Sequence, residues 1–479
     1  MHLASSSSCY SRTAKNLLVM FLKSRAFSVT TTQNPPDLFS LLHHSPNAKH
    51  LRHLHAHLLR TSTYSDVVLS SKLVLAYSKL NRLFLPTSLS VFWHMPCRNI
   101  FSWNIIIGEF SRSGFASISI GLFLRMWRES SVRPDDFTLP LVLRACSASR
   151  EAKLGDLVHV LCLKLGFNAS LFVSSALVIM YVDMGQILHA RKLFDDMPVR
   201  DSVLYTAMFG GYVQQGEAIL GLVVFREMMY SGFALDSVVM VSLLTACGQL
   251  GALKHGKSVH GWSIRRCSCF GLNLGNAITD MYVKCSNLDY AYGVFVKMPN
   301  RDVISWSSLI LGYGLDGNVV MAIKLFEEML KERIEPNAVT FLGVLSACAH
   351  GGLVEKSWLY LRLMQEYKIV PELKHYASVA DCMSRAGLLE EAEKFLEDMP
   401  VEPDEAVMGA VLSGCKVHGN VEVGERVAKK LIQLEPGKAG YYVTLAGLYS
   451  ATGRFDEAES LREWMKEKQI SKVPGCSSI

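Results

Sequence analysis

The sequence lacks the features that would predict a zinc-dependent deaminase or a membrane-spanning protein. Among its 479 residues, no His is followed two positions later by Glu, and no two cysteines are spaced as Cys-x-x-Cys. Nucleobase deaminases need both motifs, because the His and the cysteines hold the zinc ion and the Glu transfers protons. No apolar run is long enough to span a bilayer. We therefore expect no catalytic residue, no metal ion and no cofactor, and we expect neither an enzyme nor a membrane protein.

Paired cysteine spacing is also missing. Several of the twelve cysteines recur at core positions of a repeat, so buried thiols in a reducing compartment are favoured over disulfides. Cys267 and Cys269 form only a Cys-x-Cys pair, for which a structural role is favoured over metal binding. His53 and His57 share one face of an expected helix, and a metal site there is the less favoured alternative.

No linker divides the sequence into separate domains. Pro/Ser-rich stretches and charge runs are absent after about residue 40, although the chain is longer than single hydrophobic cores usually extend. The net charge of +6 and the pI near 8.6 are mild for a nucleic-acid-binding protein. This pattern favours one long array preceded by a leader.

The leader contains no acidic residue. Residues 1–36 are rich in serine and threonine and contain four basic residues, a composition typical of an organellar transit peptide. A tail without a targeting role is the alternative. Residues 25–28, Arg-Ala-Phe-Ser, resemble a mitochondrial processing site. We therefore predict a disordered transit peptide over residues 1–36 and localisation to the mitochondrion, with the chloroplast as the alternative.

Two independent markers recur along the chain with a step of 101 residues. One is the dipeptide Ala-Cys and the other is Met-Pro. They are found at Cys146, Cys247 and Cys348, and at Met197, Met298 and Met399. Each marker recurs twice at the same interval. This regularity predicts a repeat array rather than a single-core domain.

Each step contains three similar repeats of about 31 to 36 residues, a length typical of stacked helical hairpins. The second helix of a hairpin carries an apolar stripe at i, i+3, i+4 and i+7. The stripe occurs at Ala190, Leu193, Phe194, Met197, at Ala291, Val294, Phe295, Met298, and at Ala392, Phe395, Leu396, Met399. Because a lone hairpin cannot bury such a stripe, we predict an all-α fold. The expected architecture is a right-handed superhelical α-solenoid of stacked helix-turn-helix repeats whose inner helices line a concave face.

Further markers connect these repeats to a known family. Short repeats end in Met-Pro-x-Arg-Asp/Asn, at residues 95–99, 197–201 and 298–302, and long repeats contain Ala-Cys and a Gly and His such as Gly256 and His260. The sequence thereby resembles the plant pentatricopeptide repeat (PPR) proteins in which long, standard and short repeats alternate, the PLS class. The resemblance covers residues 38–479. It extends to the family's C-terminal E-type motifs, but not to the DYW deaminase domain that some members carry.

The resemblance implies a repeat array over residues 37–404 and E-type helical motifs over residues 405–479. The expected repeats are 32–66, 67–99, 100–135, 136–170, 171–201, 202–236, 237–271, 272–302, 303–337, 338–372 and 373–404.

In this family one repeat reads one nucleotide of single-stranded RNA through its fifth and last residues. An amide at the fifth position suits a pyrimidine, and a small hydroxyl leaves room for a purine. The base-reading pairs implied here are Ser71 with Asn99 (adenine), Asn104 with Asp135 (uracil), Ser175 with Asp201 (guanine), Thr206 with Asp236 (guanine), Asn276 with Asp302 (uracil) and Ser307 with Asn337 (adenine). Four pairs depart from the pattern, namely Pro140 with Ser170, Val241 with Gly271, Leu342 with Glu372 and Ala377 with Asp404. The implied target is 5′-A-U-N-G-G-N-U-A-N-N.

The resemblance also implies residues that strengthen binding without reading sequence. The second residue of a repeat stacks against bases, which contributes about 1 to 3 kcal/mol per base. Good stacking residues are Phe101, Phe172, Val203 and Ile304, and poor ones are Asn273 and Lys374. Phosphate contacts are expected from Lys79, Arg112, Lys284 and Arg385, with an ordinary solvated charge as an equally favoured interpretation.

The function that the resemblance implies is sequence-specific recognition of organellar RNA at a site of cytidine-to-uridine editing. A deaminase-bearing PPR protein or another editing factor would then dock in trans on residues 405–479. Two departures affect this docking surface, since the family usually has Trp where this chain has Met408 and Ser478. The alternatives are a role in RNA splicing, stability or translation, and a protein-binding scaffold similar to tetratricopeptide repeats.

Overall fold

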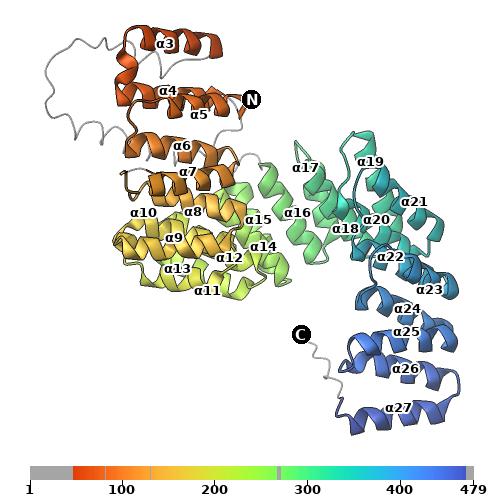
Figure 1. Ribbon diagram of the computed structural model, residues 1–479. Coiled ribbons are helices and arrows are strands. Elements are labelled where there is room, and N and C mark those ends of the chain that lie inside the picture. Colours follow the sequence, from red (N-terminus) through yellow and green to blue (C-terminus); the bar gives the residue numbers. More distant parts are fainter. Residues whose placement is uncertain (1–46, 81, 130, 267–270, 471–479) are drawn as a thin grey trace. The chain divides into compact units, whose positions relative to one another are not determined.

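The computed structural model describes residues 47–80, 82–129, 131–266 and 271–470 (Figure 1). All regular structure in these ranges is helical, which confirms the predicted all-α fold. The predicted leader with its processing site, Cys267, Cys269 and Ser478 lie outside the described residues. The predictions made for them are therefore not addressed by the structure.

The chain divides into two parts, one ending at Met180 and the other beginning at Tyr181. The N-terminal part consists of successive helices with short 3-10 turns between some of them. Its elements are α3 (Ala48–Arg60), η1 (Thr63–Ser65), α4 (Val67–Leu80), η2 (Arg82–Phe84), α5 (Leu85–Trp93), α6 (Ile100–Arg112), α7 (Ala116–Glu129), α8 (Thr138–Ser149), α9 (Ala152–Lys164), η3 (Phe167–Ala169) and most of α10 (Leu171–Asp183).

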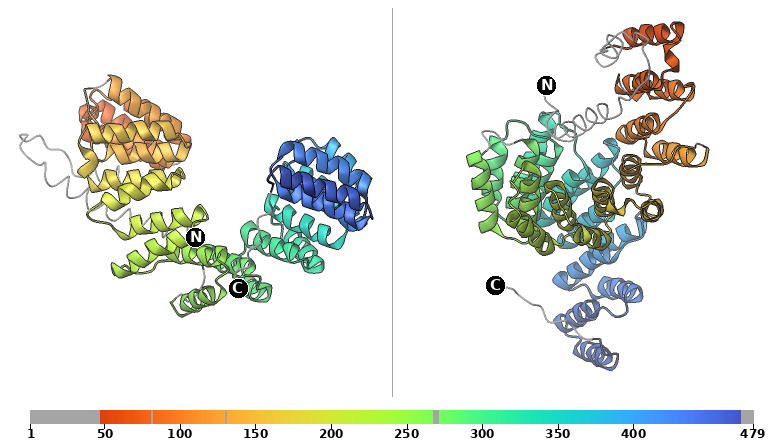
Figure 2. Two further views of the ribbon diagram at one scale, coloured as in Figure 1. Left: turned by 90° about the horizontal axis from the view of Figure 1, so that it is seen from below. Right: turned by 90° about the vertical axis from the view of Figure 1, so that its left-hand side faces the viewer.

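The C-terminal part is a longer run of helical hairpins (Figure 2). The first helices of its hairpins are α12 (Ser202–Gln214), α14 (Ser237–Gln249), α16 (Leu272–Lys284), α18 (Val303–Leu315), α20 (Ala338–Gly351), α22 (Leu373–Arg385), α24 (Glu405–His418) and α26 (Ala439–Ala451). The second helices are α11 (Ile187–Asp196), α13 (Ala218–Tyr230), α15 (Leu253–Arg266), α17 (Leu288–Lys297), α19 (Val319–Lys331), α21 (Val354–Glu366), α23 (Leu389–Asp398), α25 (Val421–Leu434) and α27 (Phe455–Glu467).

The first helices form a continuous row within each part. Besides its own second helix, each first helix contacts the next first helix along the chain, from α4 through α6 to α8 and from α12 onward to α26. The helices α18 and α20 approach each other closely, because a Cβ on Gly314 would lie 2.1 Å from the carbonyl oxygen of Gly343. Glycine is therefore required there for the helices to pack. The stacking confirms the predicted solenoid of helical hairpins.

The apolar stripes of the second helices form the core between hairpins. Ala190 and Phe194 on α11, and Ala291 and Phe295 on α17, are all almost fully buried, as predicted. Within the C-terminal part, the core residues from α14 to α26 form one connected hydrophobic cluster. Burial of a large side chain of this kind contributes about 1.5 to 3 kcal/mol.

The Ala-Cys markers also lie in the core. Cys146, Cys247 and Cys348 are buried and free. Burial raises the pKa of Cys146 and Cys348 to about 12 and that of Cys247 to about 11. These thiols are therefore protonated and unreactive at neutral pH, which confirms the prediction of buried, unpaired cysteines at these markers.

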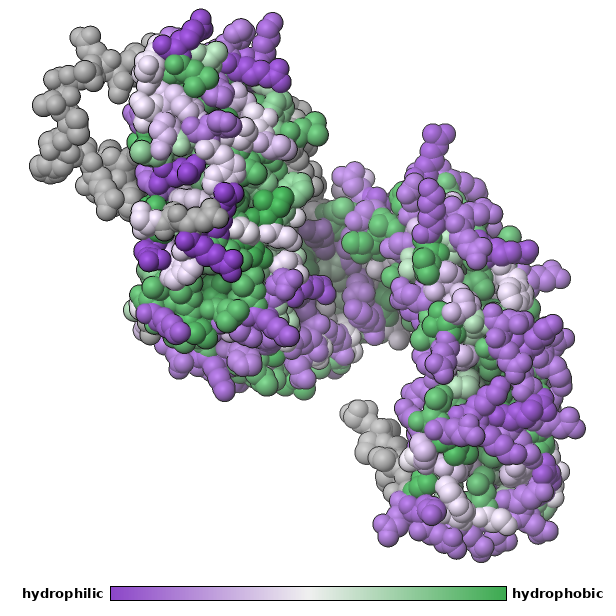
Figure 3. Space-filling view, viewed as in Figure 1, coloured by the Kyte–Doolittle hydropathy of each residue, from purple (hydrophilic) through white to green (hydrophobic). Residues whose placement is uncertain are grey.

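Ion pairs connect successive second helices near the C-terminal end. Arg426 on α25 donates to Glu393 on α23 with a shortest distance of 2.6 Å, and Lys430 lies 3.2 Å from Glu397 one turn further along. Figure 3 shows that hydrophilic side chains predominate on this end of the C-terminal part. These ion pairs add to the stability that the core provides but do not replace it, because individual surface ion pairs contribute little to the free energy of unfolding.

Histidines of the long repeats contact tyrosines of the next hairpin. His55 Nδ1 lies 3.3 Å from the Tyr77 hydroxyl, and His260 Nδ1 lies 3.0 Å from the Tyr282 hydroxyl. His53 and His57 are instead exposed on α3. Within the described ranges no group of three potential ligands is positioned to hold a metal ion, and no helix is long and apolar enough to cross a membrane.

Candidate nucleic-acid interface

The last residue of most repeats caps the first helix of the next repeat. Asp201 Oδ1 accepts a hydrogen bond of 2.9 Å from the backbone N–H of Leu204, and Asp236 Oδ1 accepts one of 2.9 Å from Val239. Comparable bonds are made by Asn99, Asp135, Asp302, Asn337 and Asp404. A cap of this kind stabilises a helix by about 0.5 to 2 kcal/mol. It fixes each of these side chains at the N-terminus of a first helix, on the row that the first helices form.

Three of the predicted base-reading pairs are joined by direct hydrogen bonds. The Nδ2 of Asn104 donates to Asp135 Oδ1 at 3.0 Å, and the Nδ2 of Asn276 donates to Asp302 Oδ1, also at 3.0 Å. In the third pair, the Ser307 hydroxyl lies 3.1 Å from Asn337 Oδ1. The structure therefore brings these side chains together, although they are 26 to 31 residues apart in sequence.

Each joined pair includes a hydroxyl that the sequence analysis did not identify. Thr138 Oγ1 lies 2.6 Å from Asn104 Oδ1 and 2.8 Å from Asp135 Oδ1. Ser305 takes the same position beside Asn276 and Asp302, and Thr340 takes it beside Ser307 and Asn337. In all three joined pairs a Ser or Thr lies three residues after the last residue of the repeat, but the spacing alone is not sufficient, because Ser102 has it relative to Asn99 and donates instead to the Asn99 backbone oxygen.

The other predicted pairs are arranged differently. Ser71 and Thr206 donate their hydroxyls to carbonyl oxygens of their own helices, those of Val67 and Ser202. Neither is hydrogen-bonded to its predicted partner, Asn99 or Asp236, within the part of the chain that the structure describes. Ser175 lies on α10 in the N-terminal part, whereas Asp201 precedes α12 in the C-terminal part.

The long repeats place other groups at the corresponding positions. Glu372 forms an ion pair of 2.9 Å with Lys374. Its backbone N–H donates to His375 Nδ1 at 3.0 Å. Pro140, Val241 and Leu342 offer no side-chain hydrogen-bonding group, so these repeats lack the polar pair found elsewhere.

Apolar side chains at the second position of the repeats are exposed. Phe172 is 51% exposed, Val203 40% and Ile304 54%, whereas Phe101 is half-buried. The structure adds residues that the sequence analysis missed, because the long repeats also expose an apolar second residue. These are Phe137, Val238 and Val339. The rings of Phe137 and Phe172 stack with their centres 6.2 Å apart, so the surface includes an aromatic pair.

Three of the four predicted phosphate-binding residues already have an acidic neighbour. Lys284 lies 2.7 Å from Asp280, Arg385 lies 2.9 Å from Asp381, and Arg112 contacts Glu109. All three cations are substantially exposed despite these contacts. Lys79 is also exposed, in the last turn of α4.

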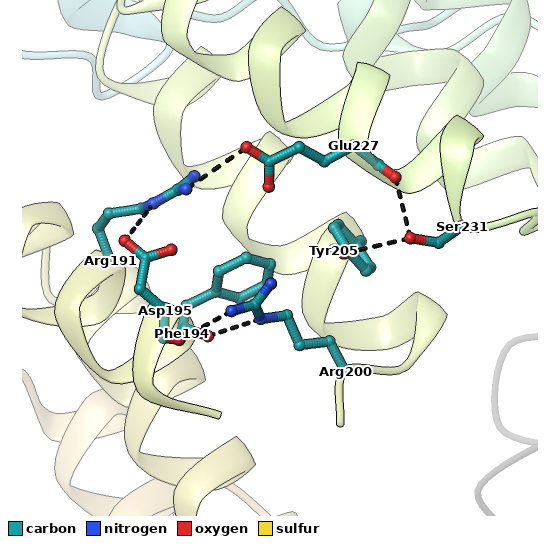
Figure 4. Close-up of polar contacts among 7 residues, drawn as sticks. All are labelled: Arg191, Phe194, Asp195, Arg200, Tyr205, Glu227 and Ser231. Carbon is teal, nitrogen blue, oxygen red and sulfur yellow. Dashed lines mark hydrogen bonds and ion pairs between the residues drawn. The ribbon is translucent and has the colours of Figure 1, made fainter. Parts of the chain in front are cut away.

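The arginine of the short-repeat marker donates hydrogen bonds to carbonyl oxygens at the C-terminal end of the second helix. Arg200 donates from Nε to the carbonyl oxygen of Phe194 at 2.7 Å and from Nη2 to that of Asp195 at 2.8 Å (Figure 4). Arg301 makes the corresponding bonds to Phe295 and Val296. The marker therefore satisfies free carbonyls of the helix terminus directly before the residue that caps the next helix.

Hydrogen bonds keep the Asp302 carboxylate charged. Partial burial acts to raise its pKa, but bonds from Ser305 and Asn276 outweigh this effect and lower the pKa overall. These bonds all reach Oδ1, and within the described residues Oδ2 of Asp302 and Oδ2 of Asp135 receive none. Each carboxylate thus has one oxygen without a hydrogen-bond partner among the described residues.

Met408 lies in the core rather than on a surface. Its side chain is only 5% exposed and belongs to the hydrophobic cluster of the C-terminal part. A docking contact through this residue would therefore require α24 to shift.

Sequence comparisons identify known repeat families in this chain. The PPR repeat matches residues 101–131, 203–233, 339–369 and 375–402, the PPR repeat family matches residues 301–350, and the E motif matches residues 418–479.

Similar proteins are known from Arabidopsis thaliana. Pentatricopeptide repeat-containing protein At4g14170 is 88% identical over the full length of both chains. The mitochondrial protein At3g13770 is 37% identical over 89% of this chain and 68% of its own length. The chloroplastic protein CRR2 is 37% identical over 88% of this chain and 65% of its own length.

Among solved structures, the pentatricopeptide repeat protein PPR10 from maize has a TM-score of 0.41 and 16% sequence identity. The alignment covers 98% of this chain and 79% of PPR10.

Proposed function

On the premise that this chain belongs to the pentatricopeptide repeat family, we propose that it binds single-stranded organellar RNA in a sequence-specific manner. The proposed target is 5′-A-U-N-G-G-N-U-A-N-N, with one repeat per nucleotide and the RNA running parallel to the protein. The biological role proposed for it is recognition of a cytidine-to-uridine editing site.

The observation that carries this proposal is the joined polar pair at the start of a first helix. Asn104 with Asp135, and Asn276 with Asp302, each combine an amide donor with a carboxylate at 3.0 Å. The amide keeps a second N–H, and the carboxylate keeps Oδ2. One donor beside one acceptor complements the N3–H and O4 groups of uracil.

The neighbouring surface supports binding of a single strand. Exposed apolar residues at the second position, such as Phe172 and Ile304, provide faces on which bases stack without sequence preference. The exposed cations Lys79, Lys284 and Arg385 provide charge for phosphates. Lys284 and Arg385 must each give up a carboxylate partner to bind a phosphate. We therefore attribute the affinity for RNA mainly to stacking.

The E motif supports the editing role. It matches residues 418–479, which include the last two second helices, α25 and α27. In this proposal the repeat over residues 373–404 lies a few nucleotides upstream of the edited cytidine, and a deaminase-bearing partner docks on residues 405–479. We propose the mitochondrion as the compartment on the composition of residues 1–36, and relatives carry both mitochondrial and chloroplastic names.

RNA recognition is tested by measuring the affinity of the protein for 5′-A-U-N-G-G-N-U-A-N-N and for a scrambled RNA of the same composition. Both RNAs are measured at one fixed near-physiological salt concentration, because the phosphate contribution depends strongly on salt. We expect tighter binding to the designed order. Equal binding would contradict the assigned base-reading pairs, and no binding to either RNA would favour a protein-binding scaffold.

The editing role is tested separately by sequencing organellar transcripts from plants with and without the protein. We expect loss of cytidine-to-uridine conversion at a site preceded by the target sequence. Intact editing together with altered splicing or transcript ends would contradict the editing role and retain RNA binding.

A further inference from the structure

Thr138 and Ser305 stand out because neither belongs to a base-reading pair, yet each contacts both members of one. Thr138 Oγ1 lies 2.6 Å from Asn104 Oδ1 and 2.8 Å from Asp135 Oδ1. Ser305 Oγ lies 2.6 Å from Asn276 Oδ1 and 3.0 Å from Asp302 Oδ1. The same arrangement thus occurs in two separate places, once in each part of the chain.

The hydroxyl and the carboxylate together hold the amide in one orientation. The Nδ2 of Asn104 faces the Asp135 carboxylate at 3.0 Å, and a flipped amide would place its oxygen against that negative charge. The Thr138 hydroxyl has a single proton, which it shares between the two oxygens that it contacts. The hydrogen bond from the buried Thr138 hydroxyl therefore holds the amide oxygen toward the protein interior, and the N–H of Asn104 that is not bound to Asp135 remains for a base.

We propose that Thr138 and Ser305 are positioning residues for base recognition: by holding the amide oxygens of Asn104 and Asn276 toward the buried hydroxyls, they orient these amides so that an N–H group is presented to the base, and thereby set the preference for uracil over cytosine. This inference rests on the proposed function. Uracil offers carbonyl oxygens that accept from the amide, whereas cytosine offers an amino group that would bind a free amide oxygen.

Both hydroxyls act through the asparagines and not by touching RNA. Thr138 and Ser305 have no exposed surface. Their Oγ atoms also accept the backbone N–H of Asp135 and Asp302, each at 3.2 Å. Because both hydroxyls are buried, a base that binds the pair would contact the asparagine and the carboxylate and not the hydroxyl.

The pair formed by Thr206 and Asp236 provides a natural contrast. The residue that corresponds to Thr138 there is Val239, which has no hydroxyl and is buried. Thr206 donates to the Ser202 carbonyl oxygen, and Asp236 binds only backbone N–H groups in the described structure. In this comparison of described residues, the fifth and last residues are hydrogen-bonded to each other where the hydroxyl is present and are not where Val239 replaces it.

The test replaces each hydroxyl and measures base preference, not affinity alone. The variants Thr138→Val and Ser305→Ala are compared with the native protein on RNAs that carry U or C at nucleotide 2, read by Asn104, or at nucleotide 7, read by Asn276. We expect Thr138→Val to lower the U-to-C affinity ratio about three- to tenfold at nucleotide 2 only, and Ser305→Ala to do so at nucleotide 7 only. The conservative variants Thr138→Ser and Ser305→Thr retain the hydroxyl and should keep the native ratio.

Thr279→Val is the matched control. Thr279 is buried on α16, and its hydroxyl donates to the Gly275 carbonyl oxygen of the same helix. Its removal should leave both U-to-C ratios unchanged. Thermal unfolding of all variants reports any loss of stability separately from base preference.

The outcomes distinguish this inference from the proposed function. A native protein without preference at nucleotides 2 and 7 would contradict the proposed base-reading pairs themselves. A native preference that Thr138→Val and Ser305→Ala preserve would overturn the positioning role. An equal loss of affinity for U and C, accompanied by a lower unfolding temperature, would also overturn it, because the hydroxyls would then serve only as helix caps.

Discussion

The guanidinium of Arg200 lies over the ring of Phe194, with its carbon 4.7 Å from the ring centre, while its Nε donates to the Phe194 carbonyl oxygen at 2.7 Å. Stacking and hydrogen bonding thus connect the same two residues. Arg301 and Phe295 repeat the relationship, also at 4.7 Å. The Met-Pro-x-Arg marker therefore recurs with the same spacing for a structural reason. Its Arg must lie close enough to the end of the preceding helix to bind the carbonyl oxygens there.

We predict that Arg200→Lys destabilises the protein by about 1 to 3 kcal/mol, because an ammonium group cannot reproduce the planar stack and the two hydrogen bonds together. Urea unfolding measures the change. Arg226→Lys is the control, because Arg226 is exposed on α13 and should change stability by less than about 0.5 kcal/mol. Equal stability of the two variants would show that the marker arginine contributes nothing specific.

Phe194→Ala should destabilise the array by about 3 to 5 kcal/mol, because it removes a large side chain from a well-packed core. Phe194 has no exposed surface, whereas Phe455 on α27 is 68% exposed. Phe455→Ala should therefore have a small effect in the same denaturation experiment. A small effect of Phe194→Ala would mean that the stripe does not pack as described.

Asn104→Ser should shift preference at nucleotide 2 from pyrimidine toward purine, since the shorter side chain leaves more room and removes the amide donor. Binding to four RNAs that differ only at that nucleotide measures the shift. Asn318→Ser is the matched control, because Asn318 caps α19 and Ser is an equally good cap. Unchanged discrimination by Asn104→Ser would contradict the assigned register of the repeats.

Stability should depend on pH through Glu393. Hydrogen bonds from Arg426 lower the pKa of Glu393 below its ordinary value of 4.5, against the opposing effect of partial burial. A lowered pKa in the folded state gives stability that is present at neutral pH and is lost as the pH falls through that lowered value.

Glu393→Gln should therefore lower the free energy of unfolding by about 1 kcal/mol at pH 7. The difference in this free energy between the variant and the native protein should shrink as the pH falls below 4.5. Chemical unfolding at several pH values measures the difference. Glu397→Gln is the control, because that side chain is 63% exposed in its pair with Lys430. A difference for Glu393→Gln that does not vary with pH would contradict the ion-pair explanation.

The fold was largely predictable because its signals are local and repeated. The i, i+3, i+4, i+7 stripe around Phe194 and Phe295 predicts a buried helix face, and both side chains are buried. The markers at Cys146 and Cys247 predict core positions for the same reason. The boundaries of the individual repeats stay predictions, as does the hand of the superhelix.

The candidate site was less predictable, because its details depend on neighbouring hairpins. The approach of Asn104 to Asp135 was expected from the family resemblance, but the position of Thr138 follows from the packing of α6 against α8. Sequence spacing does predict the i, i+4 pairing of Asp280 with Lys284. The base-reading role of these residues stays a prediction until RNA binding is measured.

The double use of the last residue in the base-reading repeats limits how such a protein can change its target. Asp302 and Asn337 cap a helix with the same side chain that we propose for base recognition. Only Asp, Asn, Ser and Thr cap well through a side chain, so few residue types keep the cap at this position, whereas the long repeat that ends in Gly271 has no side-chain cap. The fifth residue does not cap a helix, and its identity varies along the chain: it is Asn at 104 and 276, Ser at 307 and Thr at 206. Evolution or design can therefore change specificity most freely at the fifth residue, while a change of the last residue in a base-reading repeat also removes a helix cap unless the new residue caps equally well.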